Sequence, residues 1–294
     1  MHAISTVSEA RPHTSHTQIN MFRECTLHWW MRYVCEIRKP KSIQIAVGSA
    51  VHEVLARNFR QKAVTRVDLP IDELLDEYAT LFDLMLAEGA QTPANKTSTS
   101  YRDAGLATLQ EYLTTMAPSM YPRLITVRGT SEPAVEMELR VRILQTDYDM
   151  LGYVDLWLED GRAVDYKVCA SKWSARDLEK HKRQVLAYCM MLGSIVPFTF
   201  HICVRDEIRP RVQELPCTDI SDQDIESHLD DVRVALVEME ALRRGDVKPI
   251  PKSGYCNEQL CSHYWECRDW KYGIFDLTRY ATDRHGVDTL EEAA

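Results

Sequence analysis

The stretch that decides the fold is GYVDLWLEDGRAVDYK, residues 152–167. Two apolar runs flank the Glu-Asp-Gly sequence at 159–161, which is typical of a tight turn, so the stretch predicts a β-hairpin. Asp155 lies inside the first run, and Asp165 and Lys167 lie inside the second. A charged group in a strand that should bury Val and Leu is costly unless it has a partner. The hairpin therefore predicts that something is bound beside these three side chains.

Strand geometry indicates what that bound group is. Side chains alternate along a strand, so Asp165 and Lys167 face one side of the sheet and Tyr166 faces the other. Asp155 faces the side of Asp165 if the pairing register allows it. Two carboxylates that converge there suit a hard cation such as Mg²⁺ or Mn²⁺. Lys167 would then orient a metal-bound water and stabilise charge on a phosphate.

An acidic residue on one strand, followed by D-x-K on the next, resembles the PD-(D/E)xK nuclease superfamily. By itself the triplet is more often an exposed surface pair than a catalytic one. Three further motifs resemble the RecB-like branch of that superfamily. They are GSAVH with its G-x-x-x-H pattern at 48–52, GYVD at 152–155, and QVLAY with its Q-x-x-x-Y pattern at 184–188. Their order and separation along the chain also agree with that branch.

The resemblance implies a complete active site. Its catalytic residues would be Asp155, Asp165, Lys167, Gln184 and Tyr188. Its ligands for Mg²⁺ or Mn²⁺ would be His52, Asp155, Asp165 and the carbonyl of Tyr166. Glu53, next to His52, points about a quarter-turn away on a helix and is a weaker candidate.

The surrounding periodicity predicts a mixed α/β protein. Apolar residues at helical spacing predict helices near 17–34, 46–63, 71–89, 101–116, 174–192 and 221–244, and period-two patterns predict strands from 134 onward and near 197–217. With the resemblance, this implies a restriction-endonuclease-like core, a mixed central sheet flanked by helices, with an N-terminal helical subdomain. We expect a flexible leader at 1–16, one RecB-like domain at 17–275 and a tail at 276–294. That domain would comprise a helical part at 17–120, a catalytic core at 130–245 and a cysteine cluster at 250–270.

Composition narrows the class of protein. The 294 residues are 45% hydrophobic and 27% charged, which is typical of a soluble globular protein with an ample core. No apolar stretch approaches the length of a membrane span, and the polar N-terminus lacks a signal region, which predicts a cytoplasmic protein of a bacterial or phage-infected cell. A net charge of −9 excludes a surface that is basic all over, although a local basic channel remains compatible with it.

The candidate channel is the basic stretch at 171–184, directly after the lysine strand. Its candidate phosphate contacts are Lys172, Arg176, Lys182 and Arg183. For each of them a solvated helix face is an equally good interpretation.

Nine cysteines in a chain of this class indicate metal ligands or reduced thiols rather than disulfides. Cys256, Cys261 and Cys267 lie together in CNEQLCSHYWEC, and Cys25 lies in TQINMFRECTLHWW. The second sequence resembles the opening motif S-x-I-x-x-F-x-x-C-P of RecB-like iron–sulfur nucleases. The AddB subunit of bacterial repair nucleases and the fourth CRISPR-associated (Cas) protein family share that layout. The resemblance implies a 4Fe–4S cluster on these four cysteines that staples the two ends of the chain together.

The cysteine spacing departs from the family pattern at one place. The usual arrangement is C-x-x-C-x5-C, whereas four residues separate Cys256 from Cys261. Zinc is therefore the alternative cofactor, since four thiolates suit it equally well. A mixed site that uses His263, or less favourably His28, and three free thiols also remain open.

These features predict a metal-dependent DNA exonuclease for repair, recombination, or phage or CRISPR DNA processing. The chain lacks the G-x-x-x-x-G-K-[ST] phosphate loop, so a separate helicase, recombinase or integrase would be its partner on DNA. The alternative is a non-catalytic subunit that binds DNA ends and carries a structural iron–sulfur or zinc site. A restriction enzyme is a weaker alternative, because we find no separate domain for reading bases.

Overall fold

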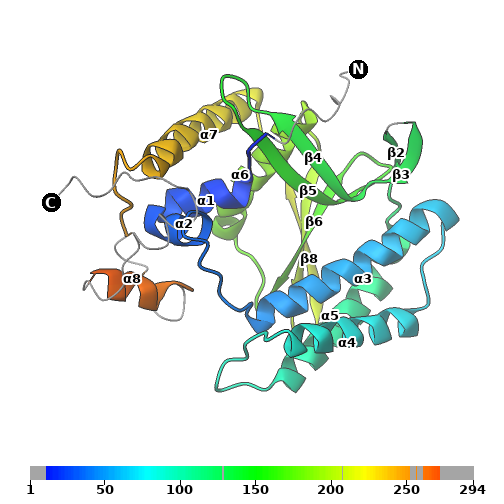
Figure 1. Ribbon diagram of the computed structural model, residues 1–294. Helices are drawn as coiled ribbons and strands as arrows, with labels where there is room; N and C mark the ends of the chain where they lie inside the picture. The colour runs from blue at the N-terminus through cyan, green and yellow to red at the C-terminus, as the bar shows by residue number, and fades with distance from the viewer. Residues whose placement is uncertain (1–10, 128, 207, 252–255, 257–260, 272–294) are drawn as a thin grey trace. The chain divides into compact units, whose positions relative to one another are not determined.

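The computed structural model describes residues 11–127, 129–206, 208–251, 256 and 261–271 (Figure 1). The chain divides into two compact units, each assembled from separate segments. The larger unit contains residues 40–140 and 152–225, and the smaller contains residues 1–39, 141–151 and 226–294. The expected parts at 17–120, 130–245 and 250–270, within one domain at 17–275, stay a prediction.

Three helices form one layer of the larger unit. They are α3 (Ile43–Thr65), α4 (Ile71–Ala87) and α5 (Ser98–Thr115), and a short 3-10 turn, η1 (Ala117–Ser119), follows them. Ser42 begins α3 by accepting the Ile45 N–H, and Arg66 ends it in the left-handed conformation with φ 68°. The three helices pack side by side around Phe59, Tyr78 and other buried apolar residues. The helices predicted at 46–63, 71–89 and 101–116 are confirmed.

The sheet beside these helices is mixed. Its strands are β4 (Val135–Arg142), β5 (Asp149–Trp157), β6 (Ala163–Cys169), β7 (Phe198–Val204) and β8 (Arg211–Cys217). Antiparallel pairing joins β5 to β6 and β7 to β8, parallel pairing joins β6 to β7, and β4 pairs with β5. The parallel step is made through α6 (Ala175–Leu192), which begins with a capping box between Ser174 and Asp177. The expected mixed central sheet flanked by helices is therefore confirmed.

The hairpin at 152–167 folds as predicted. Residues 159–161 make the turn between β5 and β6, and Gly161 adopts φ +93°, which suits glycine. A second hairpin, β2 (Leu124–Val127) with β3 (Thr130–Pro133), lies before β4 and was not predicted. Each strand has four residues; β2 (LITV) is apolar, but β3 (TSEP) has no apolar alternation that would mark a partner strand.

The smaller unit begins with β1 (His13–Thr14), α1 (His16–Glu24) and α2 (Thr26–Tyr33), and its later helices are the main part of α7 (Asp222–Arg243) and α8 (Tyr264–Lys271). The sequence predicts one helix at 17–34, whereas the structure has two. Cys25 separates them because its backbone is extended, and it serves as the N-cap of α2.

The described residues include part of the segment expected to be a flexible leader, residues 1–16. β1 pairs in parallel with the first residues of β5, where Arg11 forms an ion pair with Asp149 at 3.2 Å. The Asp149 N–H also donates to the Pro12 carbonyl. Residues 1–10 of the expected leader and the expected tail at 276–294 lie outside the described residues. Among the helices that are described, none has the length and apolarity needed to cross a bilayer.

Candidate active site

The two aspartates of the hairpin lie where β5 and β6 separate. The strands pair as far as Leu156 and Val164, and Asp155 and Asp165 are the next residues along them. There the backbone N–H of Tyr166 donates to Oδ2 of Asp155 at 2.7 Å, so a side chain accepts the hydrogen bond in place of a strand carbonyl. Both aspartates are buried, with 8% and 3% of their surface exposed. The fork between the strands thus concentrates two carboxylates at one place.

The Q-x-x-x-Y motif of helix α6 contacts both strands of this fork. The Gln184 amide donates to Oδ1 of Asp165 at 2.5 Å, and the Tyr188 hydroxyl donates to the carbonyl of Tyr153 on β5 at 2.5 Å. One turn of helix separates Gln184 from Tyr188, so a single helix face satisfies groups on both diverging strands. In the described structure, Gln184 and Tyr188 therefore position the aspartate strands.

Lys167 lies beside Asp165, as the alternation along β6 predicts. Its Nζ is 2.6 Å from Oδ2 of Asp165. Burial lowers the pKa of Lys167, but the charges of Asp165 and Asp155 outweigh it, and the net pKa is raised. The side chain therefore stays protonated near neutral pH and acts as a fixed cation rather than as a base.

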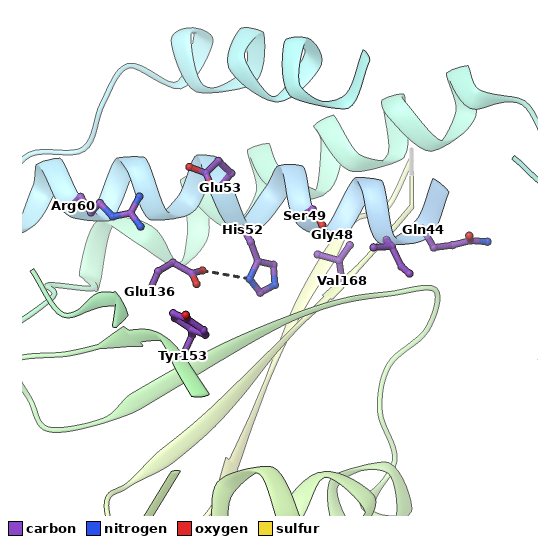
Figure 2. Close-up of a pocket in the computed structure, with 10 residues that line it drawn as sticks. Gln44, Gly48, Ser49, His52, Glu53, Arg60, Glu136, Tyr153 and Val168 are labelled. Carbon is purple, nitrogen blue, oxygen red and sulfur yellow. Dashed lines mark ion pairs between the residues drawn. The ribbon is translucent and has the colours of Figure 1, made fainter. Parts of the chain in front are cut away.

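His52 reaches the fork from α3. Its Nδ1 lies 3.5 Å from Oδ2 of Asp155. The same nitrogen lies 3.7 Å from Oε1 of Glu136, the ion pair drawn in Figure 2. Its Nε2 lies 3.1 Å from the carbonyl oxygen of Tyr166. When Nε2 donates to that carbonyl, Nδ1 is left facing the carboxylates, which is the arrangement that metal-binding histidines commonly have.

His52, Glu136 and Asp155 form a compact set of ligand atoms. Within the part of the chain that the structure describes, they are the one group of three such residues whose atoms all lie within 4.8 Å of one another. Asp165 lies outside this group, since its two oxygens contact Gln184 and Lys167. The structure thus brings His52 and Asp155 together as expected, and adds Glu136 to them.

Glu136 is the site residue that sequence reasoning missed. It lies near the start of β4 and adopts φ 49°, in the left-handed region that residues other than glycine rarely use. Its alternating surroundings, VEMEL, contain Glu138 as well, and nothing in the sequence separates the two. The Glu138 carboxylate instead accepts a hydrogen bond from the Tyr153 hydroxyl at 3.0 Å.

The pKa values of Asp155 and His52 are both raised at the fork, where negative charge is concentrated. Burial, together with the charge of Asp165, raises the pKa of Asp155 to about 7. Burial lowers the pKa of His52, but the charges of Asp155, Asp165 and Glu136 reverse this effect and raise it to about 9. A protonated imidazole therefore neutralises part of the carboxylate charge, at a place where a metal cation would do so more fully.

A cavity of about 790 Å³ opens onto this group. Gln44, Gly48, Ser49 and His52 line it from one face of α3, and Glu136 and Tyr153 line it from the strands (Figure 2). A side chain at Gly48 would meet no atom within 4 Å, so this glycine leaves open space one turn before His52. Glu53 and Arg60 also line the cavity. The cavity gives a phosphodiester access to the carboxylates.

The basic stretch at 171–184 lies partly on α6. Lys172, Arg176 and Arg183 are exposed. Lys182 is half-buried, and its Nζ lies 3.8 Å from Asp224. Three of the four candidate phosphate contacts are thus open to solvent, and the fourth already has a carboxylate beside it.

The cysteine segments meet within the smaller unit. The Thr26 hydroxyl and the Leu27 N–H both donate to the carbonyl of Ile250, and the Ile250 N–H donates back to the Thr26 hydroxyl. Lys39 forms an ion pair with Glu266. These contacts join the chain around Cys25 to the segment that contains the C-terminal cysteines.

The thiols are close enough to influence one another. Burial, reinforced by the neighbouring Cys256, Cys25 and Cys261, raises the pKa of Cys267 to about 11. Burial likewise raises the pKa of Cys261, with Cys25 and Cys256 contributing. Among the described residues, no three of these sulfur atoms fall within 4.8 Å of one another.

The two histidines near the cysteines already have partners. The ring nitrogens of His263 lie 3.0 Å from the Ile37 carbonyl and 3.0 Å from the Ser262 hydroxyl. The same hydroxyl is 3.3 Å from Nε2 of His28. Both nitrogens of His263 are thus engaged, which disfavours the mixed Cys/His site.

Comparisons with known proteins identify the family of the chain and a similar fold. The pattern of the PD-(D/E)XK nuclease superfamily matches residues 13–268. The crystal structure of a "Putative exonuclease" from Eubacterium rectale superposes with a TM-score of 0.53 at 14% identity, covering 87% of this chain and 92% of that one. A structure of a protein named SSO0001 gives a TM-score of 0.30 at 12% identity over 74% of this chain and 88% of that one, and it carries no argument. No curated protein matches the sequence.

Proposed function

Because the chain belongs to the PD-(D/E)XK nuclease superfamily, we propose that it is a metal-dependent deoxyribonuclease that removes nucleotides from DNA ends. The observation that carries this proposal is the convergence of His52, Glu136, Asp155 and the Asp165–Lys167 pair at one fork, where His52 and Glu136 line an open cavity. The fold-level likeness to a protein described as an exonuclease supports action at ends.

The residues present fit a divalent cation. One imidazole nitrogen and carboxylate oxygens, together with water, form a ligand set that suits Mn²⁺ or Mg²⁺. The raised pKa values of Asp155 and His52 indicate surplus negative charge that such an ion would balance. His52, Asp155 and Glu136 would hold the ion, with Asp165 and the Tyr166 carbonyl beside it.

The chain's own residues would have separate roles in hydrolysis. The bound ion supplies an activated water and stabilises charge on the phosphate. Lys167, kept protonated by its two carboxylate neighbours, would place a positive charge where the phosphate gains negative charge. Gln184 and Tyr188 would hold Asp165 and strand β5 in register, and the Tyr166 carbonyl would orient His52.

The alternative function is a non-catalytic subunit that binds DNA ends. A scaffold has no physical need for a protonated lysine next to a buried aspartate, and an unused buried charge is costly. The catalytic proposal is therefore favoured. A separate helicase, recombinase or integrase would supply the DNA, and repair, recombination, phage DNA processing and CRISPR adaptation are all compatible with this chemistry.

Cleavage of end-labelled linear DNA, single- and double-stranded, is the direct test. With Mg²⁺ or Mn²⁺ we expect stepwise loss of nucleotides from an end, and we expect no cleavage in EDTA. Closed circular single-stranded DNA serves as the matched substrate without ends and should stay intact. Cutting of the circle would replace the exonuclease proposal with an endonuclease, and tight DNA binding without any cleavage would support the scaffold.

We further propose that Cys25, Cys256, Cys261 and Cys267 bind a 4Fe–4S cluster. In a four-thiolate zinc site with bonds of about 2.3 Å, tetrahedral geometry places the sulfur atoms about 3.8 Å apart. The cysteines influence one another's titration, and among the described residues no three of their sulfur atoms lie within 4.8 Å of one another. The resemblance of the flanking sequences to those of RecB-like iron–sulfur nucleases supports the cluster, and zinc is the alternative cofactor.

Replacing Cys261 with serine tests this cofactor. We expect anaerobically purified C261S to lose most of its iron and its visible absorption, and to unfold at a lower temperature, because the ligands come from both ends of the chain. The control is Cys169→Ser, a half-buried thiol at the end of β6, which should retain full iron content. Zinc in place of iron in the wild-type protein, or unchanged iron in C261S, would contradict the assignment.

A further inference from the structure

A second cavity, of about 380 Å³, lies beyond the end of the catalytic strand. Its lining residues are Lys96, Ser100, Tyr101, Ala104, Ala170, Arg205, Asp206 and Ile208. β6 and β7 are parallel and end together at the pair Cys169 and Val204, and the Arg205 N–H donates to the Cys169 carbonyl at 2.8 Å. Ala170 therefore follows directly from the strand that carries Lys167, and Arg205 follows directly from β7, the strand paired with it. Ligands of open α/β sheets commonly bind at this carboxyl end.

One hydrogen bond joins the two cavities. Gln44, which lines the active-site cavity, donates from Nε2 to the Tyr101 hydroxyl at 3.1 Å, and Tyr101 lines the second cavity. On β6, Val168 lines the first cavity, and Ala170, just after the strand, lines the second. The cavities are thus neighbours, and an extended polymer lying in the first reaches the second by continuing along the surface.

The second cavity has an unused positive charge. The Arg205 guanidinium lies 5.3 Å from the centre of the Tyr101 ring, a cation–π contact that fixes its position. Its Nε is buried without a hydrogen-bond partner. In the described structure neither Arg205 nor Lys96 has a carboxylate partner. The nearby Asp206 is turned to its own loop, where it accepts the N–H groups of Ile208 and Arg209.

We propose that this cavity is a subsite for the backbone of the DNA strand that is cleaved. It would bind a phosphodiester next to the one that is hydrolysed. Arg205 and Lys96 would bind a backbone phosphate, and Tyr101 would hold the guanidinium in place. Guanidinium and ammonium groups without internal partners are what a phosphate requires, and such contacts supply most of the affinity for a single strand. The inference rests on the proposed function, because the strand it guides is the nuclease substrate.

The test is binding of fluorescein-labelled oligothymidylate, measured by anisotropy in EDTA so that no cleavage occurs. The double variant Lys96→Gln with Arg205→Gln should bind about tenfold more weakly. The slope of log affinity against log salt should fall by about 1.4, since each phosphate contact to a single strand contributes about 0.7. The matched control is Arg102→Gln, which removes a charge from the same helix as Tyr101 but from a residue paired with Asp83. This control should bind as the wild type does.

The outcomes separate this inference from the proposed function. Hydrolysis of bis(4-nitrophenyl) phosphate with Mn²⁺ by the wild-type protein reports the metal site alone. Suppose that the wild type hydrolyses this diester, and that the folded double variant binds DNA with unchanged affinity and salt slope. The assignment of the second cavity as a subsite is then wrong, and the nuclease proposal stands. If the wild type neither hydrolyses the diester nor binds the oligonucleotide, both proposals fall. A melting temperature equal to that of the wild type verifies the fold of the double variant.

Discussion

Lys167→Gln should lower the rate of DNA cleavage by about a thousandfold while leaving Mn²⁺ binding intact. The expected loss is that of one preorganised charge next to a reacting group, at the upper end of the usual range. Glutamine retains a donor for Oδ2 of Asp165, which lies 2.6 Å from the lysine Nζ, so the buried carboxylate is not left without a hydrogen bond. Single-turnover cleavage of end-labelled DNA and a Mn²⁺ titration, on the same preparation, measure the two effects.

The control for this variant is Lys172→Gln. Lys172 is exposed and lies five residues farther along the chain, so its substitution removes the same charge from the nearby surface. We expect at most a severalfold effect on cleavage, and a stronger dependence of that effect on salt. If Lys167→Gln cleaves at a rate similar to Lys172→Gln, the D-x-K lysine is not part of the catalytic machinery.

The sequence could predict how residues lie relative to one another when they belong to the same helix, strand or turn. Gln184 and Tyr188 share a face of α6 because four residues make about one helical turn, and Asp165 and Lys167 share a side of β6 because side chains alternate. The same local rules predicted the turn at 159–161. In each case the relation between the residues depends on a single helix, strand or turn, and the residue spacing is sufficient to state it.

Relations between elements could not be predicted in the same way. The fork between β5 and β6 depends on where the strands stop pairing, and the sequence left the register that orients Asp155 open. The contact of Glu136 with His52 joins a strand to a helix far away in the chain, and it depends on a left-handed φ that no glycine marks. The break at Cys25 was hidden because the helical periodicity continues through it.

The cysteines show the same difference between relations within one segment and relations between segments. Their clustering in the sequence predicts that they act together, but the contacts that bring the chain ends together are specific to the fold. Thr26, which stands where the family motif has proline, has a hydroxyl that exchanges two hydrogen bonds with Ile250. Proline has no such donor, so this chain joins its ends with a group that the motif does not contain.

Glu136→Gln should weaken Mn²⁺ binding about a hundredfold and slow cleavage at limiting Mn²⁺ by a similar factor. The side chain keeps its size and one oxygen but loses the charge. Even the loss of a residue that only hydrogen-bonds to a metal ligand commonly changes metal affinity by about 10–100-fold. Glu136 lies 3.7 Å from Nδ1 of His52, within the compact ligand group, so its effect should reach the upper end of that range. Mn²⁺ binding is measured without DNA, from the loss of the free-ion electron paramagnetic resonance signal.

Glu138→Gln is the matched control, because it removes the same charge from the same strand two residues away. Its carboxylate bonds to the Tyr153 hydroxyl and lies outside the ligand group, so the amide should retain that hydrogen bond and leave Mn²⁺ affinity within about twofold of wild type. Equal weakening in both variants would mean that Glu136 acts only through the general field of the cleft. Unchanged affinity in Glu136→Gln would return the ligand set to His52, Asp155 and Asp165, and Asp165 would then have to turn away from Gln184 to reach the ion.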